Sequence, residues 1–184
     1  MPDIITEADK KMAHAVDFAR EEFGTIRTGR AHPAMFNKLT ADYYGSPTPL
    51  QQLATFQSPE PRVMLIAPFD QTALTAIERA IRDSDLGVNP SSDGRAIRVV
   101  LPELTQERRK EYTKLARSKA EEAKVAIRNI RRHANDAIHK LVKDKEVGED
   151  DARGAEKKLD AATKKFVDQV EDLLKRKEAE LLEV

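Results

Sequence analysis

The sequence of 184 residues is long enough for one large domain or two small ones, and 40% of its residues are apolar, so we expect it to fold. It contains no cysteine, which excludes a disulfide framework and a thiolate zinc site. No run approaches the about 20 apolar residues that cross a bilayer, and the opening segment is too charged for a signal peptide, so we expect a soluble, cytoplasmic protein with no membrane partner. The net charge of +0 taken alone argues against a nucleic-acid partner, but it conceals differences between segments.

The first predicted element is an amphipathic helix. Apolar residues from Ile5 to Ile26 recur at steps of three or four, which is the period of a helix that buries one stripe. We expect this helix to end near Gly29, because Pro33 prevents its continuation.

Residues 30–104 differ in composition, because they contain eight of the nine prolines and lack the long helical period. Residues 72–84 have helical spacing, with Asp70 as a candidate cap, and the proline-containing segments 46–50 and 89–94 are predicted to be a turn and a loop. We therefore expect a small inserted α/β domain. Its strands, predicted from alternating or branched apolar residues, are 38–44, 63–67 and 96–101.

Two long helices are predicted in the last part of the chain. One begins after Thr105, a candidate cap, and continues to about residue 144 without Gly or Pro. The other follows a turn at residues 147–150. Because their connection is short, we expect an antiparallel hairpin with the first helix packed in its groove, which makes a three-helix bundle.

The longer of these helices carries the candidate functional surface. Residues 105–145 contain thirteen Lys or Arg against six acids, a net charge of +7, whereas residues 146–184 have a net charge of −4. The cations recur mostly at multiples of three and four, so they form a line that could contact a polyphosphate backbone. The alternative is that they solvate the helix and pair with its acids. The candidate nucleic-acid-binding residues from this pattern are Lys110, Lys114, Arg117, Lys124, Arg128, Arg131 and Arg132.

Signatures of an enzyme are weak. The segment from Gly24 to Ala31 superficially matches a phosphate-binding loop, but Arg30 replaces the required Lys, and Ala31 replaces the Ser or Thr that would hold magnesium. The four histidines lack metal-ligand spacing on a helix. We expect no catalysis, no cofactor and no metal, and a nucleotide hydrolase is retained only as a rival hypothesis.

Six groups of short motifs occur in order along the chain. Together they resemble the ribosome recycling factor family over essentially the whole sequence. The motifs are Arg27-Thr28-Gly29-Arg30-Ala31, Tyr43-Tyr44-Gly45 with Pro47-Thr48-Pro49-Leu50, Ser84-Asp85-Leu86-Gly87 with Asn89-Pro90, Leu104-Thr105 with Glu107-Arg108-Arg109-Lys110, Arg128-Asn129-Ile130-Arg131-Arg132, and Glu149-Asp150-Asp151.

The resemblance implies an α+β fold with a tRNA-like outline. Residues 1–29 and 105–184 would form the elongated antiparallel three-helix bundle, and residues 30–104 the inserted β/α/β domain. Family members bind the post-termination ribosome on its large subunit, and elongation factor G with GTP then drives subunit separation. We therefore expect the large subunit with its 23S rRNA and elongation factor G as partners of a monomer. A helical scaffold that binds another protein through its bundle surface is the main rival.

The resemblance also implies residue roles. Arg109, Arg128, Arg131 and Arg132 would face 23S rRNA. Two departures from the family pattern are His133, where Asp is usual, and Glu103, where a second proline of the hinge is common. The change at Glu103 could loosen the hinge, because proline would have fixed one backbone angle. The expected interdomain hinge comprises Gly29, Arg30, Ala31, Glu103, Leu104 and Thr105.

Overall fold

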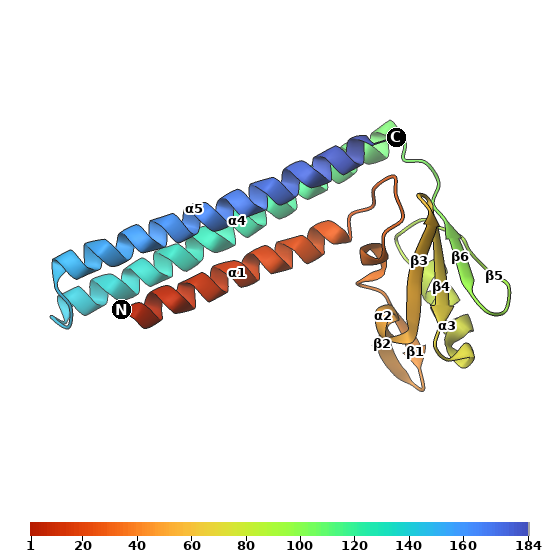
Figure 1. Cartoon of the computed structure of the whole chain (residues 1–184), viewed down its shortest axis with the longest axis horizontal. Coiled ribbons are helices and arrows are strands. Elements are labelled where there is room, and N and C mark those ends of the chain that lie inside the picture. The colour runs from red at the N-terminus through yellow and green to blue at the C-terminus, as the bar shows by residue number, and fades with distance from the viewer. Residues whose placement is uncertain (184) are drawn as a thin grey trace. The chain divides into compact units, whose positions relative to one another are not determined.

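The computed structural model describes residues 1–183 and has two compact units. The first contains Met1–Phe23 and Lys114–Glu178, and the second contains Gly24–Thr113 together with the residues from Ala179 onward. Figure 1 labels the elements along the chain. They are α1 (Pro2–Gly24), η1 (Pro33–Phe36), β1 (Thr40–Tyr43), β2 (Ser46–Pro49), α2 (Leu50–Leu53), β3 (Ala54–Glu60), β4 (Val63–Pro68), η2 (Gln71–Ala73), α3 (Leu74–Arg82), β5 (Pro90–Ser92), β6 (Ile97–Val100), α4 (Gln106–Lys143) and α5 (Glu149–Leu182).

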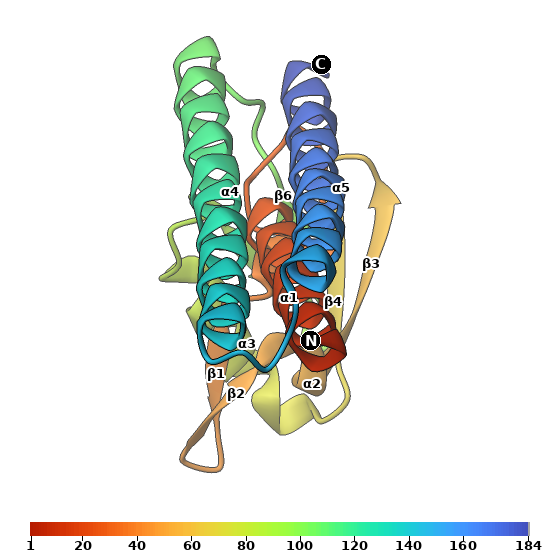
Figure 2. The ribbon, with the colours of Figure 1, turned by 90° about the vertical axis from the view of Figure 1, so that its left-hand side faces the viewer.

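The first unit is a three-helix bundle, as the sequence predicted. Figures 1 and 2 show α4 and α5 as an antiparallel hairpin with α1 alongside both. One buried cluster joins Ala8 of α1 to residues of α4 and α5, with Ile138 and Leu159 fully buried. The many alanines allow the helix backbones to approach closely, and each buried Ile or Leu contributes about 1.5–3 kcal/mol through the hydrophobic effect. In residues 1–183 no helix is both long enough and apolar enough to cross a membrane.

The ends of α4 follow from local chemistry. The Thr105 hydroxyl accepts a hydrogen bond from the Arg108 N–H at 3.1 Å, which confirms the predicted cap. At the other end Lys145 has φ 60, and the Glu146 N–H donates to the carbonyl of Leu141 at 2.9 Å. A left-handed residue just past a helix satisfies the last carbonyls and reverses the chain, which starts the connection to α5.

The first helix ends earlier than predicted. It stops at Gly24 instead of near Gly29, and the following residues Ile26, Arg27 and Thr28 are buried in an irregular segment. Gly24 is a poor helix former, and a Cβ at that position would lie 3.0 Å from the Cβ of Ala34. The apolar period on which the prediction rested therefore continues into residues that are buried but not helical.

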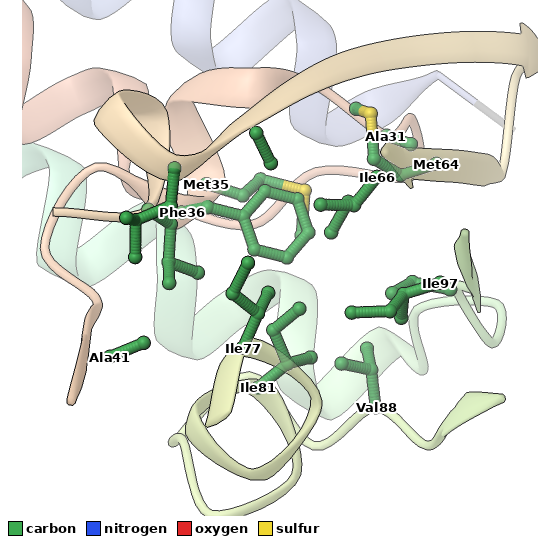
Figure 3. Close-up of a cluster of buried hydrophobic side chains, with 14 of the residues drawn as sticks. Ala31, Met35, Phe36, Ala41, Met64, Ile66, Ile77, Ile81, Val88 and Ile97 are labelled. Atoms are coloured by element: carbon green, nitrogen blue, oxygen red, sulfur yellow. The ribbon is translucent and has the colours of Figure 1, made fainter. Parts of the chain in front are cut away.

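The second unit contains two antiparallel sheets. β1 and β2 form a hairpin, and the other four strands are arranged in the order β3-β4-β6-β5. Figure 3 shows the core, in which Ile77 and Ile81 of α3 meet Phe36 and the sheet residues Ile66 and Ile97. All five side chains are completely inaccessible to solvent. The predicted cap of the helical region is confirmed as well, because the Asp70 carboxylate accepts a hydrogen bond from the Thr72 N–H at 2.9 Å.

Three strands of the second unit were not predicted. β2 and β5 fall where the sequence suggested a turn and a loop, and β3 exposes most of its residues. Each carries proline and lies at the edge of its sheet, where the missing N–H costs no ladder hydrogen bond. These strands contain proline and polar residues and form by pairing with a neighbouring strand, so the sequence pattern did not predict them.

Candidate nucleic-acid interface

The predicted phosphate-binding residues are all on α4, beside its buried stripe. That stripe contains Ala116, Ala120, Ala123, Ile127, Ala134 and Ile138, and it turns one side of the helix toward the bundle. Of the eight predicted cations, Arg109, Lys124 and Arg131 are half-buried. The exposed ones are Lys110, Lys114, Arg117, Arg128 and Arg132.

Three of the cations pair with carboxylates of α5. Arg117 Nε lies 3.1 Å from Glu178 Oε1, and Arg131 Nε lies 2.8 Å from Asp160 Oδ1. Lys124, between them on α4, pairs with Glu171. We call Arg117, Lys124 and Arg131 the seam cations. The two steps of seven residues keep them along the edge where α4 meets α5.

The seam continues with a histidine. His139 Nε2 lies 2.6 Å from Glu156 Oε1, so another α4 side chain meets another α5 carboxylate. On the opposite flank of α4, Lys119 lies 3.7 Å from Glu22 of α1. The charges of α4 therefore serve partly as contacts between helices. The alternative in which α4 cations pair with acids is realised here, although their carboxylates come mainly from other helices.

A second group of cations points outward. Arg132 Nη2 donates to the neutral amide oxygen of Asn129 at 3.0 Å. Arg128 Nη1 lies 3.7 Å from Glu121 Oε1, but both side chains are more than half exposed, so this pair contributes about 0–1 kcal/mol. Lys110 and Lys114 have no ion-pair partner within residues 1–183. We call Lys110, Lys114, Arg128 and Arg132 the outward cations.

The spacing of the outward cations places them on one side of α4. Successive members are 4, 14 and 4 residues apart, and at about 3.6 residues per turn each step is close to a whole number of turns. From Lys114 to Arg132 the rise is roughly 27 Å at about 1.5 Å per residue. The outward cations therefore present charges that no nearby acid neutralises strongly, in a line suited to phosphates.

Arg109 differs from both groups. It is half-buried, and its Nε is buried without a hydrogen-bond partner in the described structure. Arg109 precedes the buried residue Ala116 by seven residues, which is about two helical turns, so both side chains lie on the same side of α4. The spacing of Arg109 from Ala116 is visible in the sequence, so this difference from the neighbouring cations could have been predicted.

Two of the predicted hinge residues, Ala31 and Glu103, contact the turn between β3 and β4. The N–H of Ala31 donates to the carbonyl of Pro61 at 2.6 Å, and Glu103 Oε1 lies 3.4 Å from Arg62 Nη1. Arg30 Nε lies 3.1 Å from Glu183 Oε2. Of the remaining hinge residues, Leu104 is buried, Thr105 caps α4, and a Cβ on Gly29 would lie 3.4 Å from the carbonyl oxygen of Glu183.

The segment considered as a phosphate-binding loop has another environment. It follows the helix α1 instead of a strand, and its residues Ile26, Arg27 and Thr28 are buried. Arg27 belongs to the first of the six motif groups, and it is also a buried charged side chain. A charged residue between two helical segments gives no sign of its burial in the sequence, so this feature was missed.

Comparisons of sequence place the chain among known proteins. A family model described as ribosome recycling factor matches residues 19–182. The ribosome-recycling factor of Cutibacterium acnes is 62% identical over 184 residues, which is 100% of both chains. That of Streptomyces coelicolor is 64% identical over 182 residues, covering 99% of this chain and 98% of that protein.

Comparisons of structure agree. A solution structure of the ribosome recycling factor gives a TM-score of 0.80 at 40% identity, covering 100% of this chain and 97% of the other. Models described as the T. thermophilus ribosome recycling factor and the E. coli elongation factor G bound to the E. coli post-termination complex include a chain with a TM-score of 0.72 and 42% identity, covering 99% and 98%. The chain therefore belongs to the ribosome recycling factor family.

Proposed function

We propose that this protein binds the post-termination ribosome on its large subunit and, with elongation factor G and GTP, promotes subunit separation. The observation that carries the proposal is the line of outward cations on α4, in a chain whose relatives are ribosome-recycling factors. The structural relative described as bound to the post-termination complex supports the same partner. The protein itself hydrolyses nothing in this proposal.

The outward cations are the main contacts with 23S rRNA in our proposal. Phosphate oxygens bind Arg and Lys through charge-assisted hydrogen bonds, and Arg can donate two at once. A seam cation that turned toward a phosphate would leave an α5 carboxylate facing the RNA, which opposes binding. Arg132 and Arg128 therefore contribute more than the seam cation Arg131.

The two parts of the chain have different roles in this proposal. Residues 1–29 and 105–184 act as the bundle that anchors the protein to rRNA, and residues 30–104 act as a domain that moves when elongation factor G engages it. The hinge at 29–31 and 103–105 carries the motion. Glu103, which stands where the family pattern has proline, leaves one more backbone angle free to rotate.

The test is a subunit-splitting assay with purified post-termination ribosomes. We expect separation when the protein, elongation factor G and GTP are all present, and little when any one is omitted. Co-sedimentation with large subunits at increasing salt measures the electrostatic part, because the log-log slope falls by about 0.7–0.9 for each phosphate contact. Absence of binding at low salt would contradict the proposal and favour the rival helical scaffold that binds another protein.

A further inference from the structure

The connection between α1 and η1 contains a buried arginine. Arg27 is 8% exposed, between the buried residues Ile26 and Thr28. Connecting segments normally lie at the surface, and an arginine is rarely buried unless it is paired. Its burial therefore indicates a specific contact that this position requires.

The contacts of Arg27 join two segments that are far apart in the sequence. Its Nη2 donates to the carbonyl oxygen of Pro102 at 2.5 Å, across 75 positions of the chain. The Tyr112 side chain on α4 lies close enough to the guanidinium to raise the pKa of Arg27. The guanidinium thus connects the segment that leaves α1, residues 25–31, to the segment that enters α4, residues 101–105.

Favourable charge interactions do not explain why an arginine is buried at position 27. Burial lowers the pKa of Arg27, Tyr112 raises it, and the nearby positive charge of Arg108 lowers it. Within residues 1–183 Arg27 has no carboxylate partner, and its Nε is buried without a hydrogen bond. A charge buried under these conditions costs free energy, and the contact of the guanidinium with the Pro102 carbonyl offsets part of that cost.

The two segments also share an anchor. The N–H of Ala31 donates to the carbonyl of Pro61 at 2.6 Å, and the N–H of Leu101 donates to the carbonyl of Arg62 at 2.7 Å. Adjacent residues of the turn between β3 and β4 therefore bind both segments. With Arg27 across them, the outgoing and incoming segments form one hydrogen-bonded structure.

We propose that Arg27 is a positioning residue that couples residues 25–31 to residues 101–105, so that the two segments of the hinge move as one. In the absence of this coupling each segment would bend separately, and a displacement of the domain would be partly lost. The significance for ribosome splitting rests on the proposed function, whereas the coupling itself is a property of the free protein.

Hydrogen exchange of the free, full-length protein tests the coupling. In the Arg27→Lys variant one ammonium replaces the fork, and we expect amide exchange to rise by about tenfold in both segments, with β4 and β6 unchanged. Tyr112→Phe removes only one hydroxyl, and we expect a smaller rise in the same two segments. Arg20→Lys, at an exposed arginine of α1, is the matched control and should change neither segment.

Two exchange results would overturn the proposal. One is faster exchange in residues 25–31 with residues 101–105 unchanged, which would mean that Arg27 supports its own segment alone. The other is an equal rise in β4 and β6, which would indicate general destabilisation. If Arg27→Lys does not fold, the same two exchange results are looked for in Tyr112→Phe, and either of them would overturn the proposal.

A ribosome assay separates the positioning role from binding. We expect Arg27→Lys to co-sediment with large subunits as the wild type does, because the outward cations are unchanged, but to split ribosomes several-fold more slowly. Splitting at the wild-type rate would overturn the positioning role. If the wild type neither binds nor splits ribosomes, the proposed function fails, and the exchange data still decide the coupling.

Discussion

The seam cations and the outward cations of α4 have the same chemistry and different surroundings. Arg131 and Arg132 are adjacent in the sequence, yet Arg131 lies against Asp160 of α5, whereas Arg132 donates a hydrogen bond to the neutral amide of Asn129. A step of one residue rotates a side chain by about 100° around the helix, which moves it from the seam to the outer side. A basic helix such as α4 therefore carries two kinds of cation. One kind pairs with carboxylates of a neighbouring helix, and the other does not.

The largest expected effect comes from removing outward charge. We expect the triple variant Lys114→Gln, Arg128→Gln, Arg132→Gln to lose about a thousandfold in affinity for the large subunit, at roughly tenfold per charge-assisted contact. Co-sedimentation at fixed salt measures the loss. The control changes the net charge equally on α1, as Lys10→Gln, Lys11→Gln, Arg20→Gln, and should bind nearly as the wild type does. Equal losses in both triple variants would make the effect one of net charge.

Single substitutions at neighbouring positions sharpen the contrast. We expect Arg132→Ala to lower large-subunit affinity by about tenfold and Arg131→Ala to lower it clearly less, because removing Arg131 removes an ion pair already made within the protein. Both variants should keep the helicity of the wild type by circular dichroism. A larger loss for Arg131→Ala than for Arg132→Ala would invert the proposed order.

The seam cations should matter more for stability than the outward ones. Lys124 is half-buried and pairs with Glu171, so Lys124→Gln leaves a partly buried carboxylate unpaired. We expect its free energy of unfolding to fall by about 1 kcal/mol, and that of Arg132→Gln to stay within about 0.5 kcal/mol of wild type. Urea unfolding monitored by circular dichroism measures both. Equal stability losses would remove the distinction between the two groups.

The smallest expected effect is a gain. Asp160→Asn releases Arg131 from its carboxylate and removes a negative charge from the edge of the cationic face. We expect affinity for the large subunit to rise about twofold to threefold at low salt, and the gain to shrink as salt screens it. Asp17→Asn on α1, where Arg20 is the partner, is the matched control. A gain of the same size in the control would show that the affinity depends on the net charge and not on where the carboxylate lies.

Much of the fold could be predicted because helices carry their period in the sequence. The stripe that includes Ile127 and Ala134 marks α4, and Thr105 marks its start. The edge strand β3 could not be predicted, because its pairing with β4 supplies most of what holds it in place. The end of α1 was placed too late for a different reason, because the buried apolar residue Ile26 continues the helical period past Gly24.

The candidate site was predictable in its residue types and not in its partners. The spacing of Lys114 and Arg132 is visible in the sequence. The pairing of Lys124 with Glu171 is not, because these residues are 47 positions apart and their contact depends on the register of the α4–α5 hairpin. The burial of Arg27 could not be predicted, since its neighbours Pro102 and Tyr112 lie 75 and 85 positions away in the sequence and meet it only in the folded chain.

The prolines in the edge strands have a consequence for the behaviour of the protein at high concentration. Pro47 and Pro49 in β2, Pro59 in β3 and Pro90 in β5 cannot donate the backbone hydrogen bond that a strand from a second molecule would need. Open sheet margins are the usual starting points of intermolecular β-aggregation. The prolines of β2, β3 and β5 thus remove donors that pairing with a strand of a second molecule would use.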